Sequence, residues 1–182
     1  MMAYHPVAKL LHWLMAIMLL AIFLFGLRLE DLTLAERMEH LPVHASLGLS
    51  LLALVLIRLV WRWQHPPPPY SDSMSPGQQK WARGAVHAFY ALMTLQPVLG
   101  FLHAATYVDF EIIAFGVLNI TALLPPDATL TGIIHIMHGL CAWFLALLVI
   151  GHVGATIKHM AIDKDGIAAR MIPFLKVSKA PK

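Results

Sequence analysis

The sequence predicts an all-α integral membrane protein, a four-helix bundle that forms a single domain over residues 1–182. Of these residues, 59% are hydrophobic and only 13% are charged, whereas a soluble domain has about 25% charged residues. No stretch alternates polar and apolar residues as a barrel strand does, so helices are expected to cross the bilayer. Four apolar stretches approach or exceed the about 20 residues needed for a crossing helix. They cover about residues 7–29, 44–63, 82–107 and 131–158.

The first expected helix covers about residues 7–29. A lysine ahead of a long apolar run, here Lys9, is also a feature of cleaved secretory signals. This run is too long for such a signal, and no small-x-small cleavage site follows it. We therefore expect a retained first helix, with His12 near its beginning.

The second expected helix covers about residues 44–63 and starts with His44. Four consecutive prolines, Pro66–Pro69, follow it. Proline cannot continue a helix and favours an extended polyproline conformation. Residues 64–80 are therefore expected to form a loop between two helix hairpins.

The third and fourth expected helices cover about residues 82–107 and 131–158. Pro97 should bend the third helix and free a backbone carbonyl. Cys141 in the fourth helix is the only cysteine, so the chain can form neither an internal disulfide nor a cluster held by several thiolates. Redox chemistry would therefore depend on a bound cofactor.

Charged residues divide the connections into two sets. The N-terminal segment, the loop at 64–80 and the tail at 159–182 are basic, whereas the connections after the first and third helices are acidic. The positive-inside rule then places both termini and the proline-rich loop in the cytoplasm. The net charge of +3 follows from this topology and does not indicate nucleic-acid binding.

Four histidines lie within the apolar runs. An ionisable side chain inside a bilayer costs several kcal/mol unless it is paired or liganded. By depth, His12 matches His152 at the inner level, and His44 matches His138 at the outer level. His138 and His152 lie on the same helix, about 21 Å apart along its axis, and the rotation between them is about 40° short of four full turns. Both side chains therefore face the bundle interior.

Two axial imidazoles from facing helices are a typical way for a helix bundle to hold a b-type haem. Such an iron has no open coordination position and carries single electrons. We therefore predict two haem b groups, although any one of these histidines is equally well explained as a hydrogen-bonded packing residue. Small residues beside the histidines would let a porphyrin approach the helices. They are Ala45, Ser46, Gly48, Gly139, Gly151 and Gly154.

Several short motifs accompany the histidines. They are L-H-W at 11–13, H-A-S-L-G at 44–48, P-V-L-G at 97–100, A-F-G at 114–116, H-G at 138–139 and K-D-G-I-A-A-R-M-I-P at 164–173. With these motifs the sequence resembles the bacterial cytochrome b561 family over nearly its whole length. The resemblance implies a four-helix di-haem quinone oxidoreductase of the bacterial inner membrane, with its haem ligands at His12, His44, His138 and His152.

The resemblance also implies a reaction. Characterised members of the family are similar to superoxide:ubiquinone oxidoreductases, with ubiquinone as the membrane substrate. The alternative is a cytochrome b subunit that links a hydrogenase or dehydrogenase partner to the quinone pool. The outer connections are acidic, so an anionic donor such as superoxide would depend on Arg28 and Arg37 as local attractors.

Further candidates surround the two expected haems. His159 and Lys158, near the inner haem, are candidates for binding quinone and delivering a proton, and His87 faces the same layer. An interfacial position explains His159 equally well. Four arginines at the membrane boundaries could bind haem propionates bidentately, or could equally be topology and snorkelling residues. They are Arg28, Arg37, Arg58 and Arg62.

Two other classes of protein would also use such a bundle. A metal-ion transporter could employ membrane histidines, but it usually needs carboxylates at the same depth, and none falls securely within a span core. A purely structural anchor for a partner enzyme would need no haem, and the two histidine pairs argue against such a role. Besides lipid and quinone, a redox partner protein therefore stays open, and the sequence predicts no oligomeric state.

Overall fold

The structure, a computed structural model, describes residues 2–71 and 73–175. Its helices α1, α2, α3 and α4 are all long and apolar enough to cross a membrane, which confirms the predicted four-helix membrane fold. They cover Pro6–Glu30, Leu34–Gln64, Pro76–Ala105 and Ala128–Lys158. Part of the basic charge expected in the loop and tail lies outside the described residues, namely that of Lys176, Lys179 and Lys182, together with the acidic Asp72.

Each helix begins at a residue whose side chain accepts a hydrogen bond from the first turn. These residues are His5, Thr33, Ser75 and Asp127. At Thr33 and Ser75, a glutamate or glutamine three residues later bonds back to the capping residue and completes a capping box. The caps satisfy backbone donors that the helix itself leaves unpaired.

Helix α2 begins well before the expected start of the second span at residue 44. Its first turns are polar, so hydropathy does not reveal them, but the capping box at Thr33 starts the helix there. Pro42 lies inside the helix, and the hydroxyl of Ser46 donates to its carbonyl at 2.7 Å. The helix therefore continues from the membrane into the polar boundary.

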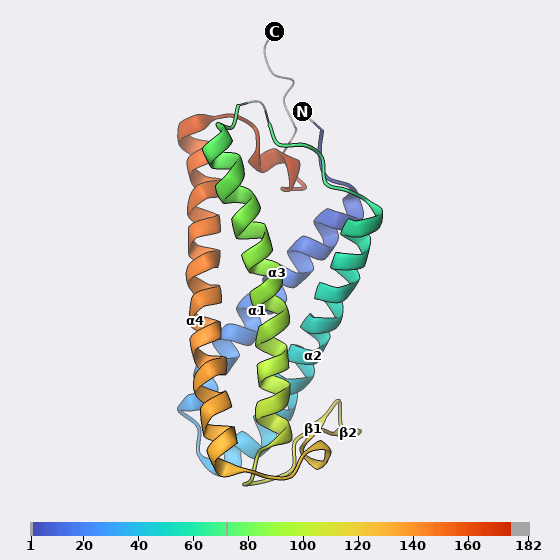
Figure 1. The fold of residues 1–182 in the computed structure, drawn as a ribbon, viewed down its shortest axis with the longest axis vertical. Helices are drawn as coiled ribbons and strands as arrows, with labels where there is room; N and C mark the ends of the chain where they lie inside the picture. Colours follow the sequence, from blue (N-terminus) through green and yellow to red (C-terminus); the bar gives the residue numbers. More distant parts are fainter. Residues whose placement is uncertain (1, 72, 176–182) are drawn as a thin grey trace.

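The helices run along the long axis of the molecule, and the first and last described residues lie at the same end (Figure 1). We call this the terminal end and the opposite one the distal end. Helix α3 packs on α4 and on α2, and α2 packs on α1, whereas α1 and α4 pack less closely. The looser α1–α4 side leaves space within the bundle.

A buried apolar layer crosses the middle of the bundle. Its central members are Met15, Leu51, Val55, Met93 and Leu145. Large apolar side chains also cover the outside of the helices, as at Ile17, Leu147 and Ile150. The fold therefore has an apolar centre and an apolar outer surface suited to lipid.

The α3–α4 connection at the distal end contains a small hairpin that the sequence did not predict. Strands β1 (Ile113–Ala114) and β2 (Leu118–Asn119) pair antiparallel, and a 3₁₀ turn, η1 (Thr121–Leu123), follows them. Figure 1 shows the hairpin beside the distal end of α2.

The segment after α4 folds back over the terminal end. It contains a π-helical turn, η2 (His159–Asp163), and a 3₁₀ turn, η3 (Ala168–Arg170). The guanidinium of Arg170, which is only 5% exposed, donates to the carbonyls of Met2 at 3.0 Å and Pro69 at 2.7 Å. The N-terminal segment, the proline-rich loop and the C-terminal segment therefore meet at one side chain.

Candidate functional site

The structure brings the four membrane histidines together in two pairs. His12 of α1 faces His152 of α4, with ring centroids 6.2 Å apart and ring planes at 66°. His44 of α2 faces His138 of α4, with centroids 6.3 Å apart and planes at 76°. We call them the terminal pair and the distal pair. They are the pairs expected from depth.

The ring separations suit a metal ion between the imidazoles of each pair. Stacked rings in this protein lie much closer, as Trp61 and His65 do at 3.9 Å. An imidazole nitrogen binds a metal such as zinc at about 2.0–2.1 Å. Two such bonds, with half a ring behind each nitrogen, match the centroid separations found here.

Most ring nitrogens of the four histidines have no protein partner. Among the described residues, neither His12 nor His152 makes a side-chain hydrogen bond, and the buried Nδ1 of His44 has none. His138 differs, because its Nδ1–H donates to the backbone carbonyl of Gln96 and its Nε2 accepts from the side-chain amide of Gln96, both at 3.1 Å. A bond from the second nitrogen to a carbonyl is a common way to orient a metal-binding histidine.

One large cavity joins the two pairs. Its volume is about 2070 Å³, and all four histidines line it. A pocket for one small ligand usually measures about 300–1,000 Å³. The cavity therefore has room for more than one large flat cofactor.

Glycines shape the walls of this cavity. A Cβ added at Gly100 would lie 3.0 Å from Cε1 of His138, and one at Gly26 would lie 3.2 Å from Cε1 of His44. Sequence patterns alone did not reveal these two contacts. Gly48, Gly139 and Gly151, expected beside a cofactor, line the cavity with open space in front of them, whereas Gly154 does not line it.

Of the remaining expected small residues, Ala45 lines the cavity and Ser46 does not. Ser46 instead bonds the hairpin of the α3–α4 connection, because its hydroxyl accepts from the N–H of Phe115 at 2.8 Å. The paired imidazoles, the unpaired nitrogens of His12, His44 and His152, the glycine walls and the cavity volume together fit a haem at each pair.

Two candidate arginines line the cavity at the terminal end. Arg58 donates to the hydroxyl of Tyr90 at 3.1 Å and to the carbonyl of Ala8 at 2.7 Å. The guanidinium of Arg62 lies over the Tyr90 ring, 5.9 Å from its centroid. Neither has a carboxylate partner among the described residues, so both can take an anionic group in the cavity.

The two candidate arginines at the distal end are placed differently. Arg37 lines the cavity, but its guanidinium donates to the carbonyls of Leu29 and Glu30, at 3.2 and 3.0 Å. It therefore caps the C-terminal end of α1. Arg28 is exposed and does not line the cavity. The structure therefore brings Arg58 and Arg62, but not Arg28, to the wall of the cavity.

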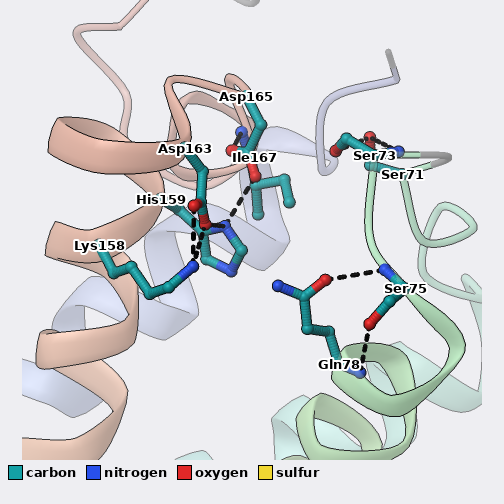
Figure 2. Close-up of polar contacts among 9 residues, drawn as sticks. All are labelled: Ser71, Ser73, Ser75, Gln78, Lys158, His159, Asp163, Asp165 and Ile167. Atoms are coloured by element: carbon teal, nitrogen blue, oxygen red, sulfur yellow. Dashed lines mark hydrogen bonds and ion pairs between the residues drawn. The ribbon is translucent and has the colours of Figure 1, made fainter.

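The quinone candidates His159, Lys158 and His87 all line the terminal part of the cavity. Nδ1 of His159 lies 2.7 Å from the carboxylate of Asp165 and 3.1 Å from that of Asp163. Lys158 bonds the carboxylate of Asp163 at 2.6 Å (Figure 2). His87 is exposed and bonds to none of the described residues.

The two carboxylates beside His159 were missed by sequence reasoning, which counted them only as charges of the tail. Their positions soon after the histidine were the available signal, but the π-helical turn that brings them together was not evident. Gln78 of α3 also lines the cavity, and Figure 2 shows its side-chain nitrogen directed toward His159.

A second histidine contact at the distal end was also missed. The rings of His103 and His135 lie 5.2 Å apart and both residues line the cavity. His135 Nε2 lies 3.8 Å from the carboxylate of Glu30. This polar group borders the distal pair, on the side toward the acidic connections.

Comparisons with known proteins identify the family of the chain. A family model described as prokaryotic cytochrome b561 matches residues 3–174, a region that contains all four helices and both pairs. The chain is also similar to cytochrome b561 homolog 2 of Escherichia coli (strain K12), with 30% identity over 171 residues that cover 93% of this chain and 90% of that protein. The chain thus belongs to the prokaryotic cytochrome b561 family, which implies electron transfer in a membrane through b-type haem.

Proposed function

We propose that this protein is a di-haem b-type cytochrome that moves electrons between a donor at the distal end and ubiquinone at the terminal end. The observation that supports this function best is the presence of two histidine pairs at two levels of one cavity. A haem iron with both axial positions filled exchanges single electrons and leaves no site for oxygen.

The chain's own residues would hold the cofactors as follows. His12 and His152 ligate one haem, and His44 and His138 ligate the other. The carbonyl of Gln96 holds the His138 ring in its orientation. Arg58 and Arg62 bind propionates at the terminal end, where guanidinium groups face the cavity.

Haem content of single histidine variants tests this ligation. We expect two haems per chain in the wild type and about one in His44→Ala and in His12→Ala, measured by haem quantification and reduced-minus-oxidised spectra. His135→Ala is the matched control, because it lines the same cavity outside the pairs. Two haems retained in both pair variants would refute the assignment.

The terminal part of the cavity is the proposed quinone site. His159 is held by two carboxylates, so its other ring nitrogen is free to bond a quinone carbonyl and deliver a proton. Gln78 offers a second donor from α3 (Figure 2), and Lys158 supplies positive charge at the same mouth.

Quinone reduction in reconstituted vesicles tests this site. His159→Ala should slow it strongly, and Asp165→Asn should slow it less, because the histidine loses only its orienting partner. Lys164→Ala, exposed on the same segment, is the control. Unchanged quinone reduction in His159→Ala would refute the proposed quinone site and would leave the haem assignment intact.

The donor is either superoxide or a partner dehydrogenase or hydrogenase. The distal connections are acidic, with the carboxylate of Glu30 exposed beside His135, which favours a cationic or protein donor over an anion. Salt screens such charges. Superoxide-driven reduction should therefore speed up as ionic strength rises, whereas reduction by a partner with a basic surface should slow down.

A further inference from the structure

The hairpin of the α3–α4 connection packs against an uncharged stretch of α2. Helix α2 carries no charged residue between Glu39 and Arg58, a stretch of about 27 Å at about 1.5 Å per residue, close to the thickness of the hydrocarbon core. Ala45 and Leu49, inside this stretch, pack against the buried cluster of the hairpin. The hairpin therefore lies beside the distal part of the span (Figure 1).

The hairpin is also apolar where it is exposed. From Ile112 to Leu124 there is no charged residue. Val117 is 85% exposed, Phe115 56% and Leu118 43%. Phe115 has a positive φ of 55°, a conformation that bulky residues rarely adopt. The loop therefore keeps a strained aromatic residue at an apolar tip.

Hydrogen bonds within the protein pair many of the backbone N–H groups of the hairpin, as a lipid environment requires. Polar backbone groups must be paired there, because no water is present to bond them. Strand pairing joins Ile113 to Asn119 and Ala114 to Leu118. In addition, the N–H of Ile112 donates to Thr121 Oγ1, and the N–H of Phe115 donates to Ser46 Oγ. The N–H groups of Gly116, Val117 and Ile120 donate to the carbonyls of Ile113, Ala114 and Ile112, respectively.

We propose that Phe115, Val117 and Leu118 insert into the acyl chains of the distal leaflet, as a re-entrant hairpin held against α2. Lipid is the occupant because the tip continues the apolar outer surface of a membrane-spanning helix and carries no charge for a protein partner. Ile112 and Ile120, on the inner side, line the same cavity as His44. The hairpin thus separates the distal pair from lipid.

Spin labels at single cysteines test the depth of the tip. In a Cys141→Ala background, Val117→Cys and Leu118→Cys are labelled in vesicles, and collision with oxygen is compared with collision with a water-soluble nickel chelate. Glu111→Cys, exposed in the same connection, is the aqueous control, and Leu147→Cys, exposed on α4, is the lipid control.

We expect the ratio of oxygen collisions to nickel collisions at both tip positions to be several-fold higher than at Glu111→Cys. It should be similar to the ratio at Leu147→Cys. Nickel access equal to that of Glu111→Cys would overturn the proposal, because the tip would be in water. Shielding from both reagents would also overturn it, because a protein surface or a second copy would then cover the tip. Two tip positions keep the test valid if one variant does not fold.

Discussion

The distal pair depends on the absence of single methyl groups. Gly100 and Gly26 lie directly against the rings of His138 and His44, so a Cβ at either position would contact the imidazole more closely than side chains normally pack. The backbone carbonyl of the neighbouring Gln96 accepts from the Nδ1–H of His138. His138 therefore has little freedom to move away from an added methyl group.

Gly100→Ala should reduce haem binding at the distal pair. The added Cβ, 3.0 Å from Cε1 of His138, displaces the ring from its partner. We expect total haem to fall from about two to about one per chain, with the terminal pair still loaded. Gly84→Ala, in the same helix with nothing within 4 Å of its added Cβ, should keep both haems. Full haem content in Gly100→Ala would show that His138 can shift freely.

At the scale of elements, hydrogen bonds join the ends of α3 and α4. The buried Thr131 hydroxyl, one turn into α4, donates to the carbonyl of Thr106 at 2.5 Å, and the N–H of Asp127 donates to the same carbonyl at 3.2 Å. These bonds set where α4 starts relative to α3. They therefore also position the part of α4 that carries His138.

Thr131→Val should destabilise the protein by about 1 kcal/mol, the net value of one hydrogen bond. The substitution keeps the side-chain shape, so packing is largely retained while the bond to Thr106 is lost. Thermal unfolding in detergent measures the loss. Thr129→Val is the control, because Thr129 is exposed in the same turn. Equal unfolding temperatures for the two variants would contradict the role of this bond.

At the scale of the whole molecule, Arg170 holds three distant segments together at the terminal end. Its guanidinium bonds the carbonyls of Met2 and Pro69 and lies 5.7 Å from the ring centroid of Tyr4. Its own carbonyl accepts from the N–H of Tyr4 at 3.1 Å. The segment after α4 is thereby kept over the terminal mouth of the cavity.

Arg170→Gln should loosen all three segments at once. Hydrogen bonds to a charged group contribute about 1.5–3 kcal/mol, and glutamine is too short to reach both carbonyls. We expect faster proteolysis of the N-terminal segment and of the proline-rich loop, with the helices intact. Lys80→Gln, an exposed change at the same end, should cleave like the wild type. If proteolysis rises only in the C-terminal segment, Arg170 does not link the three.

The charge pattern predicts that the terminal end faces the cytoplasm. Figure 1 shows the first and last described residues at one end, and the basic excess belongs to that end. A C-terminal reporter that is active only in the cytoplasm should therefore be active, and one that is active only in the periplasm should be silent. The reverse result would mean that the donor end faces the cytoplasm, and the proposed direction of electron flow across the membrane would be inverted.

The paired histidines of the site could be predicted from the sequence, whereas most of the residues around them could not. The depth of His12, His44, His138 and His152 can be counted along helices of known rise, so their pairing could be predicted. The partner Gln96 could not, because that contact depends on how α3 packs on α4. Asp165 could not, because the π-helical turn that brings it to His159 is not evident in the sequence. The early start of α2 was missed because capping, not hydropathy, determines it.

The sequence by itself determined that four helices cross a membrane and that four histidines stand in them at two levels, because hydropathy and helical rise are local properties of the chain. Tertiary structure alone decided the glycine contacts of His44 and His138, the link at Arg170 and the position of the hairpin beside α2. These depend on which surfaces of distant segments meet, and side-chain packing decides that only when the whole bundle has formed.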